Sequence, residues 1–204
     1  AGKSRGKVIV VREVEAKFLG IDPITFKSLL MDNRYRQVQP RYLMRRVTLH
    51  RIKNGINAAP GEWYRIREEG PDRITMTYKK TIQDSIDGTE EIEVMVSHFD
   101  DAVLLLEKAG LSRIAYQETY REVWIKDNIE IVIDEWPGLR PFVEIEGANI
   151  SSVTNAATAL GFDMASAVFG SVGNVYKIEM GITPDIVNGL PRITFDSPPI
   201  KRTV

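Results

Sequence analysis

The sequence predicts an α+β domain built around an antiparallel β-sheet. Six segments alternate apolar and polar residues with a period of two, which is typical of strands that bury one face. Three further segments repeat apolar residues at helical spacing and are interspersed among the strands. Helices among strands of antiparallel type are characteristic of α+β domains.

The six predicted strands carry charged residues on their polar faces, often two of one sign at positions i and i+2. The strand segments are Arg12–Phe18, Glu62–Glu68, Ile74–Lys79, Glu91–Val94, Ile129–Trp136 and Val143–Glu146. The pairs of one sign are Glu13 with Glu15, Arg65 with Arg67, Glu91 with Glu93, and Glu144 with Glu146. The same polar faces also carry Lys17, Lys79, Glu130 and Asp134.

Apolar spacing and residues that begin or end helices predict three helices, at Pro23–Met31, His98–Ala109 and Ile150–Leu160. Gly110 and Gly161 follow the second and third helices, as C-terminal glycines do. We also expect a short helix at Ala165–Phe169. Residues 181–204 contain four prolines and are predicted to form an irregular C-terminal tail, which leaves residues 1–180 as the main domain.

The composition excludes several kinds of site. The chain has 204 residues with 27 basic and 28 acidic side chains, so its net charge of −1 gives no general attraction to nucleic acid or to an anionic membrane. The lack of cysteine excludes disulfides, zinc–thiolate sites and thiol nucleophiles, and only two histidines are present. Carboxylates remain as metal ligands, and they favour magnesium, manganese or calcium.

The apolar runs bear on location and partners. The run near the N-terminus is too short for a signal peptide or a membrane span, so we expect a cytoplasmic protein with no membrane partner. Exposed sheet edges leave formation of a homodimer open.

The paired like charges suggest a ligand if the strand faces meet in a common interior. For any one strand, the ordinary interpretation is a solvated polar face. Like charges about 7 Å apart repel each other unless an opposite charge lies between them, and the repetition of such pairs favours a ligand. If the sheet closes into a barrel, a divalent metal would lie between the acids and a polyphosphate between the bases.

This hypothesis gives the candidate residues their roles. The phosphate-binding cations are Lys17, Arg65, Arg67, Lys79 and Arg121. The metal ligands are Glu13, Glu15, Asp134, Glu144 and Glu146, with the alternative that Asp134 orients another group. The catalytic set is Glu13, Glu15, Lys17, Arg65, Arg67 and Lys79. Cross-strand ion pairs of Arg65 and Arg67 with Glu91 and Glu93 are a structural alternative that can hold at the same time.

These residues resemble the motifs of the CYTH domain family, whose members are also called triphosphate tunnel metalloenzymes. The segment Glu13–Lys17 is similar to the family's E-x-E-x-K motif, and Trp63–Arg67 is similar to its R-x-R strand. Thr75–Lys79 resembles the strand that ends in a phosphate-binding lysine. Glu144–Gly147, preceded by Asp134, resembles the second acidic strand. The resemblance covers about residues 8 to 180.

The resemblance implies a closed, eight-stranded antiparallel barrel, or tunnel, with flanking helices. It also implies dependence on Mg²⁺ or Mn²⁺ and hydrolysis of inorganic tripolyphosphate, a nucleoside triphosphate or thiamine triphosphate. One alternative is a class IV adenylyl cyclase, which converts ATP to cyclic AMP and pyrophosphate. Another is a module that binds polyphosphate or nucleotide without catalysis, because Thr119-Tyr120-Arg121 stands where the family often has a K-x-R strand. The basic segment Arg34–Asn57 does not align with the family motifs.

Overall fold

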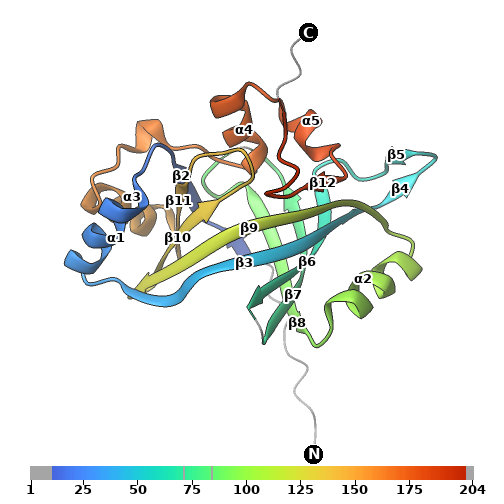
Figure 1. The fold of residues 1–204 in the computed structure, drawn as a ribbon, viewed down its shortest axis with the longest axis horizontal. Helices are drawn as coiled ribbons and strands as arrows, with labels where there is room; N and C mark the ends of the chain where they lie inside the picture. The colour runs from blue at the N-terminus through green and yellow to red at the C-terminus, as the bar shows by residue number, and fades with distance from the viewer. Residues whose placement is uncertain (1–10, 71, 84, 201–204) are drawn as a thin grey trace, which may run out of the picture.

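The computed structural model describes residues 11–70, 72–83 and 85–200, except for the side chains of residues 11–13, and it shows an antiparallel sheet with helices around it (Figure 1). The strands are β1 Val11–Glu13, β2 Glu15–Phe18, β3 Arg36–His50, β4 Ile52–Lys53, β5 Ile56–Asn57, β6 Glu62–Gly70, β7 Arg73–Thr81, β8 Thr89–Val96, β9 Ser112–Lys126, β10 Ile129–Glu135, β11 Phe142–Gly147 and β12 Arg192–Ile193. The helices are α1 Pro23–Asp32, α2 Phe99–Lys108, α3 Ile150–Ala159, α4 Val172–Met180, α5 Pro184–Asn188 and the 3₁₀ helix η1 Met164–Ser166. The six strand segments and the three main helices expected from the sequence are all present.

The main sheet follows the strand order β1-β8-β7-β6-β3-β9-β10-β11-β2. All ladders along this path are antiparallel, while β12 joins β9 as a parallel neighbour and β4 pairs only with β5. The α+β class predicted from the sequence is therefore confirmed.

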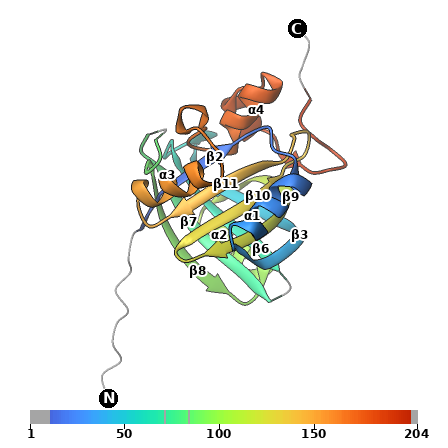
Figure 2. The same ribbon diagram turned by 90° about the vertical axis from the view of Figure 1, so that its left-hand side faces the viewer.

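The two ends of this order, β1 and β2, are consecutive in the chain and are separated only by Val14. Counted as one interrupted strand, they give a path of eight strands, and the sheet curls so that both of its edges reach the same short segment (Figure 2). Within the described residues the sheet is a curled half-barrel and not the fully closed barrel that we expected. The two edges are joined only through this short segment, which pairs with β8 over residues 11–13 and with β11 over residues 15–18.

Many apolar residues of the sheet point outward and are covered by helices. On one side, Phe18 and Ile145 pack in a cluster with Leu30 of α1 and Val153 of α3. On the other side, α2 covers β3 and β6, and Figure 1 shows α2 at the opposite end of the long strand pair from α1 and α3. Because successive strand residues face opposite sides, this outer core directs the charged neighbours to the inner face.

The longest strands, β3 and β9, lie side by side along the molecule (Figure 1). β3 occupies most of the basic segment that we could not assign from the sequence. It contains Pro40, which lacks a backbone N–H, and the register with β9 shifts between Gln39 and Tyr42. β3 pairs with β6 only over residues 45–49, so Pro40 lies where that edge of β3 has no ladder to break.

The C-terminal segment differs from the irregular tail that we expected. Its described part contains α5 and β12, and α4 before it was also not predicted. Gly181 ends α4 with φ 68°, a left-handed conformation that favours glycine, and the chain then turns back. Val187 and Ile193 pack with Tyr176 in an apolar cluster, and this burial orders a proline-containing segment.

Candidate functional site

The acidic strands meet on the inner face of the curled sheet. Directly opposed residues in an antiparallel ladder point to the same side. Glu15 opposes Glu146, and Glu146 opposes Glu130, so three carboxylates form a row across three strands. In the next row, Lys17 opposes Glu144. The motif near the N-terminus and the late acidic pair therefore share one surface.

The basic strands line the remainder of the same inner face. Thr77 of β7 opposes both Arg65 of β6 and Glu93 of β8, and Lys79 opposes Glu91. Arg65 is 8% exposed and Lys79 is 9% exposed, so these cations lie inside the molecule and not on a solvated face. The ordinary interpretation of exposed polar strands does not describe this region.

Glu144 lies between two cations of the inner face. Lys17 Nζ is 2.5 Å from Glu15 Oε1 and 3.6 Å from Glu144 Oε1, so one ammonium bridges carboxylates of β2 and β11. Arg121 Nη2 donates to Glu144 Oε2 at 2.8 Å. Burial raises the pKa of Glu144, but Lys17, Arg121, Lys79 and Arg46 together outweigh burial and lower this pKa to about 2. Glu144 is therefore ionised at neutral pH.

Asp134 holds Arg121 in a bidentate pair. Arg121 Nε donates to Asp134 Oδ1 at 2.7 Å, and Nη2 donates to Oδ2 at 2.5 Å. Asp134 is fully buried, and burial alone would lower the pKa of Arg121, but Asp134 and Glu144 raise it above its ordinary value. Both carboxylate oxygens of Asp134 are engaged by one guanidinium, which fixes the orientation of that guanidinium.

The arginines of β6 also have carboxylate neighbours. Arg65 Nη2 is 3.7 Å from Glu91 and 3.8 Å from Glu93, so the ion pairs that we weighed as an alternative do occur for Arg65. Arg67 donates from Nε to Glu69 at 2.5 Å. Burial raises the pKa of Glu69, but Arg67 and Arg73 outweigh burial and lower it to about 2. Acids and bases are thus interleaved across the whole inner face.

Arg46 of β3 was not among the candidate site residues predicted from the sequence. It is 5% exposed, its Nη2 donates to Thr119 Oγ1 at 2.6 Å, and its guanidinium carbon lies 4.6 Å from the centre of the Trp136 ring. Burial, followed by Arg67, Arg65 and Arg121, lowers the pKa of Arg46 well below its ordinary value. The alternation of Arg46 with buried Val47 and Leu49 was the available signal.

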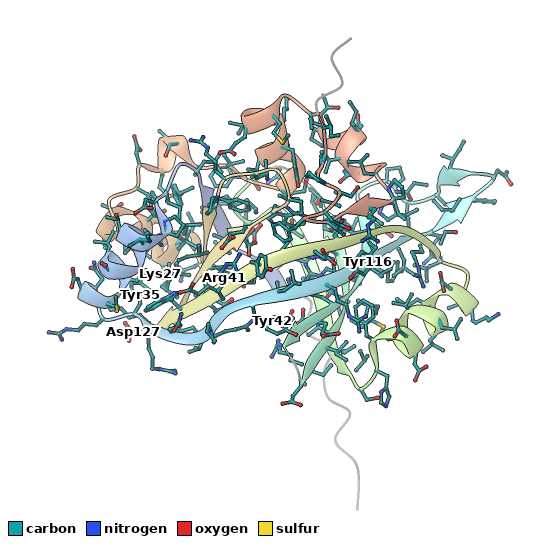
Figure 3. All side chains as sticks on the ribbon, in the orientation of Figure 1. Lys27, Tyr35, Arg41, Tyr42, Tyr116 and Asp127 are labelled. Carbon is teal, nitrogen blue, oxygen red and sulfur yellow. The ribbon has the colours of Figure 1, made fainter. Side chains whose placement is uncertain are left out.

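Other basic residues of β3 lie on the outside. Arg41, labelled in Figure 3, pairs with Glu135 at 2.6 Å. It also stacks on the ring of Tyr120, with its guanidinium carbon 3.4 Å from the ring centre. Arg45 pairs with Glu68 at 2.7 Å and lies over the Phe99 ring. These contacts assign the outward basic residues to the surface of the sheet.

The carboxylates of β2 and β11 have the chemistry that a hard divalent cation requires. Glu15, Glu144 and Glu146 provide oxygen donors from neighbouring strands, and Glu144 is ionised. Within the described part of the chain, no three acidic or histidine side chains are already grouped closely enough to hold a metal. The expected ligand Glu13 lies in β1, but its side chain is outside the described residues.

The fold and the site together define a curled β-sheet domain with a charged interior. The family model of the CYTH domain matches residues 12–167, and the chain belongs to this family. CYTH triphosphate tunnel metalloenzymes depend in general on a divalent metal. No curated protein sequence matches the chain. None of the helices in the described residues has the length and apolar character needed to cross a membrane.

Solved structures share this fold. A candidate adenylate cyclase from Vibrio parahaemolyticus is 16% identical with a TM-score of 0.64, and the match covers 79% of this chain and 95% of that chain. The PH1012 protein from Pyrococcus horikoshii is 17% identical with a TM-score of 0.62, over 76% of this chain and 93% of that chain. A candidate adenylyl cyclase from Hippeastrum, which has a dominant triphosphatase activity, is 13% identical with a TM-score of 0.53, over 83% of this chain and 96% of that chain.

Proposed function

We propose that this protein is a divalent-metal-dependent triphosphatase that binds its substrate against the inner face of the curled sheet. The observation that carries the proposal is the meeting of paired cations and paired carboxylates on one buried face. Membership of the CYTH family supports activity on a triphosphate, and the Hippeastrum neighbour has a triphosphatase activity. The proposed substrates are inorganic tripolyphosphate, a nucleoside triphosphate or thiamine triphosphate.

The inner cations are the proposed phosphate ligands. Lys17, Arg65, Arg67, Lys79 and Arg121 lie on four strands that surround the same face. Guanidinium groups bind phosphoryl oxygens through two parallel hydrogen bonds, and the ammonium groups act as point charges. Because Asp134 already fixes the orientation of Arg121, we assign Asp134 the positioning role in preference to metal coordination.

The carboxylates are the proposed ligands of Mg²⁺ or Mn²⁺. Glu13, Glu15, Glu144 and Glu146 would hold the metal, which supplies charge neutralisation at the phosphoryl oxygens when bound. In the protein alone, Lys17 forms an ion pair with Glu15, and Arg121 forms one with Glu144. A triphosphate would take the cations from the carboxylates, and the carboxylates then become available to the metal. The alternating charges therefore suit joint binding of metal and anion.

The proposed reaction is the hydrolysis of the terminal phosphoanhydride bond. A water oxygen bonds to the terminal phosphorus, the bridging P–O bond breaks, and orthophosphate leaves the shortened phosphate chain. The negative charge of the leaving oxygen develops among Arg65, Arg67 and Lys79. These residues act by stabilising that charge and by holding the substrate in line.

The test is release of orthophosphate from tripolyphosphate, ATP and thiamine triphosphate with Mg²⁺ or Mn²⁺. We expect release by the wild-type chain and loss in the double variant Glu13→Ala, Glu15→Ala. Arg45→Gln is the matched control, because Arg45 faces outward and pairs with Glu68. Release that continues unchanged in the double variant would reject the proposed site, and no release from any substrate would reject the activity.

The same incubations separate the other candidate functions. Cyclic AMP and pyrophosphate formed from ATP would identify an adenylyl cyclase, an activity named for the Vibrio neighbour as a candidate. Tight binding of tripolyphosphate without any product would identify a non-catalytic module. Chromatography of the products together with calorimetry of binding distinguishes the three outcomes.

A further inference from the structure

Arg46 of β3 lies on the inner face of the sheet, between the arginines of β6 and the arginine of β9. Arg67 of β6 lies directly opposite Arg46 in the β3–β6 ladder. Burial lowers the pKa of Arg46 most, and Arg67, Arg65 and Arg121 lower it further. Arg121 forms ion pairs with Asp134 and Glu144, whereas Arg65 and Arg67 belong to the basic strand β6. Asp134 acts in the opposite sense, and Arg46 in turn lowers the pKa of Glu144, so the guanidinium has both arginines and carboxylates within electrostatic range.

The local partners of Arg46 do not neutralise this charge. Among the described residues, no carboxylate forms an ion pair with it, and its buried Nε has no hydrogen-bond partner. Its contacts are the neutral hydroxyl of Thr119 and the ring face of Trp136. A neutral side chain could fill the same space, and an unpaired buried charge costs several kcal/mol. A structural role alone therefore does not account for arginine here.

Thr119 stands at the position where the resembling strand carries a lysine, and the guanidinium of Arg46 lies next to it. Thr119 is fully buried on β9, on the same inner face as Arg121 two residues later, and Met44 of β3 is its cross-strand neighbour. Arg46 reaches Thr119 from the adjacent strand, with its Nη2 2.6 Å from the Thr119 hydroxyl oxygen. Its positive charge thus lies beside the position where the resembling strand carries a lysine.

We propose that Arg46 is a phosphate-binding residue that supplies from β3 the cation that β9 lacks at Thr119. The inference rests on the proposed function and adds a specific ligand to it. The buried Nε–H of Arg46 is an unsatisfied donor that a phosphoryl oxygen would satisfy, and the bound anion would offset the repulsion among four arginines. The positive charge that Thr119 does not provide on β9 is then provided by Arg46 on the neighbouring strand β3, and the number of phosphate-binding cations is unchanged.

The experiment measures the affinity of four chains for inorganic tripolyphosphate by calorimetry. They are the wild type, Arg46→Gln, the double variant Arg46→Gln with Thr119→Lys, and Arg45→Gln as the matched control. We expect Arg46→Gln to weaken binding by about 10-fold to 100-fold, as the loss of a charged hydrogen bond does. We expect the double variant to recover at least about half of the lost binding free energy and Arg45→Gln to bind as the wild type.

Thermal unfolding without ligand distinguishes ligand binding from a structural role. If Arg46 serves the ligand, Arg46→Gln removes a repelled charge, and its unfolding midpoint equals or exceeds that of the wild type. A lowered midpoint without rescue by Thr119→Lys would overturn the inference in favour of a structural role. Undiminished binding by Arg46→Gln would also overturn it and would leave the triphosphatase proposal intact. Failure of the wild type to bind tripolyphosphate would overturn both.

Discussion

Replacement of Glu144 by glutamine measures how strongly the inner charges stabilise the fold. Glu144 contacts Arg121 at 2.8 Å and lies 3.6 Å from Lys17. Burial disfavours its ionised form, but these cations lower its pKa from 4.5 to about 2. One pKa unit corresponds to about 1.4 kcal/mol, so the ionised carboxylate contributes on the order of 3 kcal/mol at pH 7.

The pH dependence of this contribution has a definite sign. The folded-state pKa lies below the unfolded-state value, so the stabilisation is fully present above pH 4.5 and is lost as the pH falls toward 2. We therefore expect Glu144→Gln to cost about 3 kcal/mol at pH 7 and about 1 kcal/mol at pH 3. The two chains become more alike in stability as the medium becomes more acidic.

The assay is urea unfolding of the wild type and Glu144→Gln at pH 7, 5 and 3, in the presence of a metal chelator. Glu62→Gln is the control, because Glu62 is 3.4 Å from the half-exposed Lys80 and such pairs contribute less than about 1 kcal/mol. A cost for Glu144→Gln that is no larger than the control at pH 7 would refute the reasoning. So would a cost that stays constant down to pH 3.

Three further substitutions test other contacts by urea unfolding at neutral pH. Asp134→Ala removes the fully buried bidentate partner of Arg121 and is expected to cost about 3–5 kcal/mol, so a cost below about 1 kcal/mol would contradict the pairing. Tyr176→Phe removes a hydroxyl that donates to the Pro137 carbonyl at 2.7 Å and should cost about 1 kcal/mol, whereas no change would show that water replaces the bond. Gly181→Ala places a side chain at φ 68° and should cost about 1–2 kcal/mol, and a stabilised variant would exclude strain at this turn.

Six strand segments that carry motifs could be predicted from the sequence because each has one apolar face, whereas β9, which carries Arg121, was not among them. Ile131 and Ile133 alternate with polar residues, and the same alternation sets the face of each charge. β3 was missed because Pro40 and the register shifts around it interrupt the period of two. The partner change at Val14 depends on two distant strands, so local periodicity contains no sign of it.

The members of the candidate site could be chosen from the sequence because like charges recur at i and i+2. Arg46 was missed because no like charge lies two residues from it, so that only its alternation with Val47 and Leu49 indicated an inward side chain. Its partner Thr119 is 73 residues away, so only the assembled sheet brings them together. The pairing of Asp134 with Arg121 was hidden for the same reason, since it arises from the register of β9 with β10.

The change of partner at Val14 also affects assembly and solubility. Residues 11–18 cover the edge of β8 with one half and the edge of β11 with the other, so both edges stay uncovered until this short segment docks. Uncovered strand edges recruit strands from other chains. Deleting or destabilising this segment would therefore expose the unpaired edges of β8 and β11 together. Aggregation would then accompany the loss of Glu15 and Lys17 from the interior.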